Sequence, residues 1–195
     1  MEQRINDVLI HYVEHGSGVP LLALHGAGVD HREMEAAIEA VVPGSGYRRI
    51  YPDLPGMGRS TTGDLGCNDD VVALIADFID RLEAGPVLLL GHSYGAYLAR
   101  GVAAQRPEIV RALSRIFAEW SVDVGSGAFP APTLIAAGRR DSIAGYTDAV
   151  DLLERYPHAT LAVIDGAGHA LMHERPELLA ALLSDWLDRA RPDEK

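Results

Sequence analysis

The sequence predicts an α/β fold in which helices flank a mostly parallel central sheet. Short apolar runs bounded by turn residues alternate with stretches whose apolar residues recur at helical spacing, a pattern typical of parallel sheets with helical connections. The runs are apolar at consecutive residues, as expected of strands that are buried on both faces. With 195 residues and no internal repeat or linker, we expect a single domain over residues 1–195.

The expected strands cover residues 8–14, 20–24, 47–51, 87–90, 133–137 and 161–164, and the expected helices cover residues 30–42, 68–82, 96–105, 147–155 and 176–189. The first strand precedes the turn H-G-S-G and is expected at the sheet edge, whereas the second is a continuous apolar run that suits a buried position. The first helix ends at P-G, and Asn68 or Asp69 can cap the second. The fourth strand runs directly into G-H-S-Y-G, and Pro176 lies in the first turn of the last helix.

Charge and composition exclude several classes of protein. Seventeen Lys and Arg residues against 28 Asp and Glu residues give a net charge of −11, and such a surface repels nucleic acid and anionic lipid. Cys67 is the only cysteine, so no intramolecular disulfide can form. No signal peptide is recognised at the N-terminus, and no apolar run reaches the roughly 20 residues of a membrane span. We therefore expect a cytoplasmic protein that binds neither nucleic acid nor membrane.

Residues 91–95 have the sequence G-H-S-Y-G and fit the pattern G-x-S-x-G. The pattern alone is weak, because a glycine-rich turn can contain a serine by chance. Its position strengthens it, since it joins an apolar strand to a helix, and a nucleophile elbow holds its serine in a strained turn of this kind. Side chains two residues before or after that serine would clash, which explains the glycines. We interpret Ser93 as the nucleophile.

A serine needs a base to remove its proton, and His169 is the best placed of the eight histidines. It lies in the loop D-G-A-G-H after the last strand, where a side chain can reach a site at the strand ends. His92 adjoins the serine but points elsewhere, His25 is expected to brace a loop by hydrogen bonds, and His173 is expected in a helix. The other histidines are expected at the surface or in turns: His11, His15, His31 and His158.

The third member of such a triad is an acid that fixes the tautomer of the imidazole. Asp141 follows the fifth strand, at a carboxyl end where the sites of α/β sheets assemble. The chain order Ser93, Asp141, His169 is one that such triads use. Asp165 is too near His169 in sequence to approach the far side of its ring easily, and Asp123 is a weaker third candidate.

Acyl transfer also requires N–H donors for the oxyanion of the tetrahedral intermediate. The backbone N–H of Tyr94, the residue after the nucleophile, is one candidate. The other should come from the loop after an early strand, and residues 25–28, H-G-A-G, form that loop. Since glycine on both sides lets the backbone approach a substrate closely, we expect Ala27 to supply the second N–H.

Together these residues resemble the α/β-hydrolase superfamily. The matching segments are H-G-A-G at 25–28, D-L-P-G-M-G-R-S at 53–60, G-H-S-Y-G at 91–95, G-R-R-D at 138–141 and G-H at 168–169. The resemblance implies a serine hydrolase that cleaves carboxylic esters of small substrates through an acyl-enzyme, with the triad Ser93, Asp141 and His169 and no cofactor. A serine at the elbow speaks against haloalkane dehalogenase and epoxide hydrolase chemistry, which use an aspartate there in this superfamily.

The chain departs from this resemblance where relatives usually insert a helical lid. Only residues 114–130 connect the strand after the elbow helix to the strand before the acid. The first part of this connection could be a poor strand or a short helix, because Ser114 and Arg115 interrupt its apolar run. A missing lid leaves the pocket open and exposes an apolar rim, so the chain could assemble as a homo-oligomer. Three apolar residues would form that rim: Ile116, Phe117 and Trp120.

Three other interpretations carry less weight. A binding protein that keeps the fold without turnover fits an open pocket, because a fold does not determine function. A nucleotide-binding domain is disfavoured, since residues 26–31 lack the third glycine of G-x-G-x-x-G. A metal site at His169 and His173 lacks the glutamate of H-E-x-x-H, because position 170 is Ala170.

Overall fold

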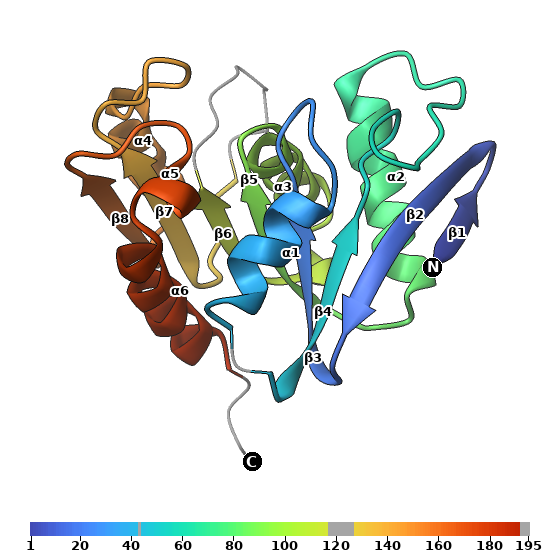
Figure 1. The fold of residues 1–195 in the computed structure, drawn as a ribbon, viewed down its shortest axis with the longest axis horizontal. Coiled ribbons are helices and arrows are strands. Elements are labelled where there is room, and N and C mark those ends of the chain that lie inside the picture. The colour runs from blue at the N-terminus through green and yellow to red at the C-terminus, as the bar shows by residue number, and fades with distance from the viewer. Residues whose placement is uncertain (43, 117–126, 192–195) are drawn as a thin grey trace.

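The computed structural model describes residues 1–42, 44–116 and 127–191. Within them a single sheet has the strand order β1-β2-β4-β3-β5-β6-β7-β8 (Figure 1). The strands are β1 (Glu2–Ile5), β2 (Val8–His15), β3 (Gly18–Leu24), β4 (Gly46–Pro52), β5 (Val87–His92), β6 (Val110–Ile116), β7 (Thr133–Gly138) and β8 (Ala159–Ile164). The helices are α1 (Arg32–Glu39), α2 (Asn68–Arg81), α3 (Tyr94–Gln105), α4 (Thr147–Asp151), α5 (Leu171–Glu174) and α6 (Pro176–Ala190), with short 3₁₀ turns at Pro107–Ile109 and Leu152–Arg155.

Strands β3 to β8 run parallel to one another, and antiparallel pairing is confined to β1 with β2 and β2 with β4. The prediction of a mostly parallel α/β sheet is therefore confirmed. The carboxyl ends of the parallel strands lie together at the top of the view in Figure 1. The loops that follow β3, β5, β7 and β8 consequently meet at one edge of the sheet.

Each face of the sheet is covered by its own pair of helices, α2 with α3 and α1 with α6 (Figure 1). Successive residues of β5 point to opposite faces: Leu89 is buried in the cluster that includes Val102 of α3, and Leu88 in the cluster that includes Trp186 of α6. This double burial explains why the strands are continuously apolar. No helix within the described residues is long and apolar enough to cross a membrane.

The edge position expected for residues 8–14 is wrong, because β1 pairs with the outer side of β2. The two strands are joined by Asn6 and Asp7, and Asn6 has a φ of 53°. Asparagine tolerates this left-handed conformation in tight hairpin turns. Strand β1 has four residues, of which only Ile5 is buried, so it has no apolar run that could have predicted it.

The start of the connection after the elbow helix is a strand. Strand β6 pairs with both β5 and β7 and extends to Ile116. Ser114 and Arg115, which interrupt its apolar run, are buried inside the protein, and the connection to β7 therefore begins after Ile116. Ile116 is itself fully buried, so it does not belong to an exposed apolar rim. Phe117 and Trp120 lie outside the described residues.

Helix α2 begins at Asn68, and the residue in its N-cap position is Cys67 rather than Asn68 or Asp69. Asp70 supplies the acceptor: its Oδ2 receives hydrogen bonds from the backbone N–H groups of Gly66 (2.9 Å) and Cys67 (3.0 Å). A carboxylate in the first turn is also favoured by the helix dipole. The prediction that Asn68 or Asp69 caps this helix is therefore wrong.

Candidate active site

Ser93 lies in the tight turn between β5 and α3, with φ 49° and ψ −119°. Residues other than glycine rarely adopt this conformation, and it costs roughly 1–3 kcal/mol. A Cβ added at Gly91 would lie 2.3 Å from the carbonyl oxygen of Gly95, and one added at Gly95 would lie 2.2 Å from that of Leu24. The backbone segments lie so close together at these two positions that only glycine fits at either. The contact between Gly95 and Leu24 also places the start of α3 against the end of β3.

We expect Gly95→Ala to lower the free energy of unfolding by roughly 2–3 kcal/mol, because its methyl group would displace the carbonyls of Leu24 and His25. Gly44→Ala is the matched control, since a Cβ there meets nothing within 4 Å and should change stability by less than about 0.5 kcal/mol. Urea denaturation of both variants measures the difference. Equal stability of the two would contradict the packing described for the turn.

His169 lies between Ser93 and Asp141. Its Nε2 is 2.9 Å from Ser93 Oγ, and its Nδ1 is 2.8 Å from Asp141 Oδ2. The side chain of Asp141 is fully buried and that of His169 is 22% exposed, while Ser93 is partly buried. The three residues singled out from the sequence thus form one hydrogen-bonded chain of hydroxyl, imidazole and carboxylate. Such a chain can transfer the serine proton to the imidazole.

The loops after β7 and β8 carry the acid and the imidazole, and they pack directly on each other. The N–H of Arg140 donates to the carbonyl of Ala167 over 2.8 Å. A Cβ added at Gly138 would lie 2.2 Å from the carbonyl oxygen of Gly168. Glycine at the end of β7 therefore allows the backbone contact that brings the two side chains together.

The carboxylate of Asp141 is held on both oxygens. Oδ2 receives the hydrogen bond from His169, and Oδ1 accepts from the N–H groups of Ile143 (2.9 Å) and Ala144 (3.0 Å). Burial raises the pKa of Asp141, but these three hydrogen bonds more than offset it, so the pKa lies below its ordinary value. An ionised carboxylate at this position keeps the ring proton of His169 on Nδ1 and leaves Nε2 to accept from Ser93.

The alternative acid Asp165 is exposed, and its carbonyl oxygen accepts a hydrogen bond from Arg175 over 2.8 Å. Asp123, the third candidate, lies outside the described residues. His173 is in α5, as expected. Because both ring nitrogens of His169 are engaged by Ser93 and Asp141, the arrangement does not favour a metal shared with His173.

The candidate oxyanion donors lie at the junction of β3 and α3. Ala27 is in the exposed turn after β3, and Tyr94 opens α3. The free backbone N–H groups at a helix N-terminus can bind an anion. His25 braces this turn, as expected: its Nδ1–H donates to the carbonyl of Gly26 (2.7 Å) and its Nε2 accepts from the N–H of Leu54 (2.9 Å). Burial lowers the pKa of His25 and favours this neutral form.

Glu33 and His92 connect the loops of the site, and sequence reasoning assigned neither of them this role. His92 Nδ1 lies 3.1 Å from Glu33 Oε1, and His92 Nε2–H donates to the carbonyl of His169 over 3.1 Å. Glu33 Oε2 accepts from the N–H of Gly26 over 2.8 Å. Burial raises the pKa of Glu33, but its interaction with His92 and the hydrogen bond from the N–H of Gly26 more than offset that effect, so the pKa lies below its ordinary value. The turn after β3 is thereby linked to the backbone of His169.

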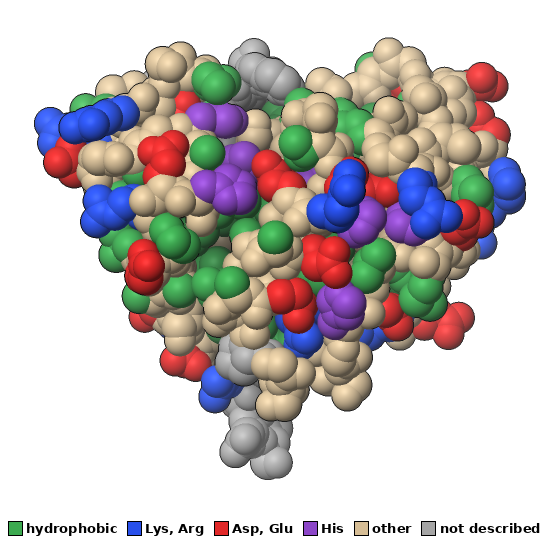
Figure 2. Space-filling view, in the orientation of Figure 1, with side chains coloured by type: hydrophobic (Ala, Val, Ile, Leu, Met, Phe, Trp, Pro, Cys, Tyr) green, Lys and Arg blue, Asp and Glu red, His purple; other side chains and the backbone are tan. Residues whose placement is uncertain are grey.

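A hollow of about 580 Å³ opens beside the turn after β3 and is lined in part by Gly28, Val29, Gly58 and His173. Gly28 and Val29 directly follow Ala27, so the hollow borders the candidate oxyanion turn. Several histidine side chains reach the face of the molecule that Figure 2 shows, most of them in its upper half.

The chain matches the family model described as "Alpha/beta hydrolase family" over residues 21–143. It is 34% identical over 113 residues to an (E)-2-((N-methylformamido)methylene)succinate hydrolase of Acinetobacter baylyi, covering 57% of this chain and 42% of that protein. It is 36% identical over 123 residues to a haloalkane dehalogenase of Mesorhizobium japonicum, covering 60% and 39%. A thermophilic esterase of Thermogutta terrifontis is similar in fold, with a TM-score of 0.81, 18% identity and 95% of each chain covered. The chain spans about two fifths of the length of these two curated relatives.

Proposed function

The chain belongs to the alpha/beta hydrolase family, and on that basis we propose that it is a serine hydrolase that cleaves carboxylic esters of small substrates. The observation that carries the proposal is the position of His169, 2.9 Å from Ser93 Oγ and 2.8 Å from Asp141 Oδ2. Ser93 is the proposed nucleophile, His169 the general base and Asp141 the acid that orients it.

In the first half of the reaction, Ser93 Oγ attacks the acyl carbon while His169 Nε2 accepts the hydroxyl proton. Asp141 stabilises the imidazolium that forms. The carbonyl oxygen of the ester becomes an oxyanion, and we assign the N–H groups of Ala27 and Tyr94 as its donors. The intermediate collapses when the bond to the alcohol breaks and His169 returns the proton to that alcohol, so the acyl group stays on Ser93.

In the second half, water replaces the alcohol. His169 accepts a proton from water as its oxygen attacks the acyl carbon, and a second oxyanion forms at the same two donors. The bond to Ser93 Oγ then breaks, His169 returns the proton to the serine, and the carboxylic acid leaves. The hydrogen bonds through Glu33 and His92 would hold the turn after β3 at a fixed position relative to the backbone of His169 during both halves of the reaction.

The residue at the elbow favours ester hydrolysis over the chemistry of some relatives. Similar proteins include a haloalkane dehalogenase and an epoxide hydrolase of Caballeronia sordidicola, and the family resemblance implies an aspartate nucleophile for both reactions. Ser93 has no carboxylate to form the alkyl-enzyme ester that they require. A neutral hydroxyl activated by His169 suits an acyl carbon instead.

The length of the connection between β6 and β7, residues 117–132, supports a reduced lid and a largely open acyl site. In a closed pocket each buried methylene contributes about 0.8 kcal/mol, which is roughly a fourfold gain in kcat/KM. For p-nitrophenyl esters from acetate to octanoate we expect a rise of less than about twofold per added carbon, with weak binding throughout. A steep and sharply peaked chain-length preference would contradict the open site. Failure to hydrolyse any of these esters would contradict the esterase proposal.

A further inference from the structure

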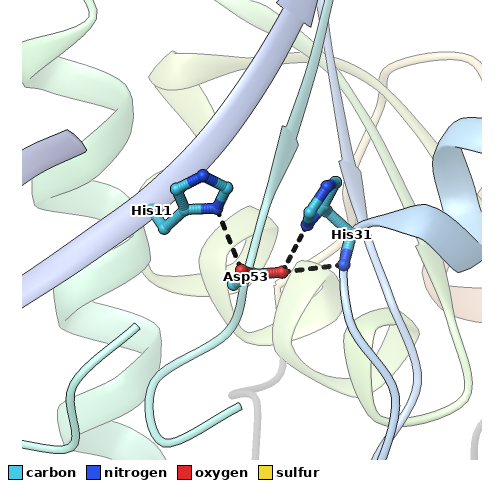
Figure 3. A group of neighbouring side chains, drawn as sticks. All are labelled: His11, His31 and Asp53. Carbon is cyan, nitrogen blue, oxygen red and sulfur yellow. Dashed lines mark hydrogen bonds and ion pairs between the residues drawn. The ribbon is translucent and has the colours of Figure 1, made fainter. Parts of the chain in front are cut away.

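His11, His31 and Asp53 form a compact group where β2, the end of β4 and the start of α1 meet (Figure 3). The sequence placed His11 at the surface or in a turn, but its side chain is 6% exposed and lies on β2. Its Nδ1 is 3.0 Å from Asp53 Oδ2, and the Nδ1 of His31 is 2.7 Å from Asp53 Oδ1. Both imidazoles therefore direct the same ring nitrogen at one carboxylate, one at each oxygen.

Backbone groups hold this carboxylate in place. Asp53 Oδ1 also accepts from the N–H of His31 (2.8 Å), and Oδ2 also accepts from the N–H of Arg59 (2.9 Å). The loop after β4 fits closely around it, because a Cβ added at Gly58 would lie 2.3 Å from Asp53 Cγ. Burial raises the pKa of Asp53, but the two amides and the imidazole of His31 more than offset that effect. The buried side chain is thus a fixed anion with two imidazoles against it.

We propose that His11, His31 and Asp53 bind one divalent transition-metal ion of the zinc type. Imidazole nitrogen and carboxylate oxygen are ligands that Zn²⁺ prefers, and three protein ligands leave one position for water. The metal would bind Nδ1 of each neutral ring, and the single ring proton would move from Nδ1 to Nε2 by exchange with water. The amides of His31 and Arg59 would keep their hydrogen bonds to the carboxylate, as partners of ligating carboxylates usually do.

The three ligand atoms lie close enough together to converge on one ion after the two rings shift. The ligand atoms all lie within 4.8 Å of one another. A tetrahedral zinc ion with bonds of about 2.0–2.1 Å holds its ligand atoms about 3.3 Å apart. The ring nitrogens now lie 3.0 and 2.7 Å from their carboxylate oxygens, so each would move outward by about 0.3–0.6 Å. The two nitrogens lie within 4.8 Å of each other and would settle about 3.3 Å apart around the ion. The side chain of His31 is 14% exposed, which gives an ion and its water ligand access.

The site depends on two histidines outside the segments that carry the family resemblance. Asp53 begins one of those segments, D-L-P-G-M-G-R-S, whereas His11 and His31 belong to none of them. The alternative role for the same three side chains is a metal-free brace held by two N–H···O hydrogen bonds. A bound metal would join β2, β4 and α1 by coordinate bonds and stabilise the folded chain in proportion to its occupancy.

The test is thermal unfolding of the EDTA-treated chain as ZnCl₂ is added. At a zinc concentration about 100 times Kd, we expect Tm to rise by roughly 5–10 °C, with one zinc bound per chain. His11→Gln and His31→Gln should each lose this rise. His15→Gln is the matched control and should keep it, because it removes an exposed imidazole that pairs with Glu35 at the surface.

Absence of a Tm rise in the parent chain at millimolar zinc would overturn the proposal. The three side chains would then serve only as a metal-free, hydrogen-bonded brace. A rise of equal size in His11→Gln and His31→Gln would do the same, because the zinc would then bind elsewhere. If either variant does not fold, anomalous diffraction at the zinc edge on the parent chain decides the question. A peak between the three side chains, with nitrogen and oxygen at about 2.0–2.2 Å, supports the site. A peak only at other histidines overturns it.

Discussion

Ser93→Ala is expected to reduce kcat for p-nitrophenyl acetate about 10⁵- to 10⁶-fold, leaving only the rate acceleration that binding and oxyanion stabilisation provide. The change removes the oxygen that would form the acyl-enzyme. It should leave the fold unchanged, because alanine tolerates φ 49° no worse than serine does, and β5 and α3 hold the turn. Steady-state hydrolysis, with circular dichroism to confirm folding, measures the effect.

Ser114→Ala is the matched control for this prediction. Ser114 is fully buried in β6, and its Oγ has no hydrogen-bond partner within the described part of the chain. Removing that hydroxyl should change kcat less than about twofold, since it contacts neither imidazole nor substrate in the proposed reaction. A folded Ser93→Ala variant that keeps a tenth or more of the parent activity would mean that another group is the nucleophile.

Asp141→Asn should lower kcat about 10⁴-fold. Asparagine can still accept the N–H groups of Ile143 and Ala144 with its carbonyl oxygen, so the side chain should stay in place. Its amide would then face His169 Nδ1, which favours the wrong tautomer and provides no negative charge for the imidazolium. The same ester assay, with substrate saturation to separate kcat from KM, measures the loss.

Asp165→Asn is the corresponding control, because Asp165 is the competing acid in the sequence and is exposed in the structure. Its side-chain charge should matter little at that position, so we expect less than about a twofold change in kcat. The reverse ranking of the two variants would show that Asp165, not Asp141, orients the base.

The central part of the fold could be predicted because its signals are local. Residues 87–90 are apolar without interruption and join a glycine-rich turn, which specifies a doubly buried strand followed by a helix. Strand β1 could not be predicted this way, since only Ile5 of its four residues is buried and its pairing with β2 depends on a two-residue turn. Strand β6 was ambiguous because Ser114 and Arg115 are polar, yet the sheet buries them. Tertiary packing overrides local preference at such positions.

The site could be predicted to the extent that each residue follows a strand. Ser93, Asp141 and His169 lie after β5, β7 and β8, and parallel strands bring those loops to one edge of the sheet. Glu33 and His92 are 59 residues apart, and no spacing or motif relates a helix residue to the residue before the nucleophile. The convergence of His11 and His31 on Asp53 likewise depends on the order β2-β4-β3, which the sequence did not specify.

The most direct test of the serine hydrolase account is covalent labelling with a fluorophosphonate, followed by mass spectrometry of the digested chain. An activated serine reacts readily with this probe, whereas an ordinary serine hydroxyl does not. The account predicts one adduct, on Ser93, which forms much more slowly in Asp141→Asn and is absent from Ser93→Ala. A folded parent chain in which Ser93 stays unlabelled, or equal labelling of the Ser93→Ala variant, would contradict it.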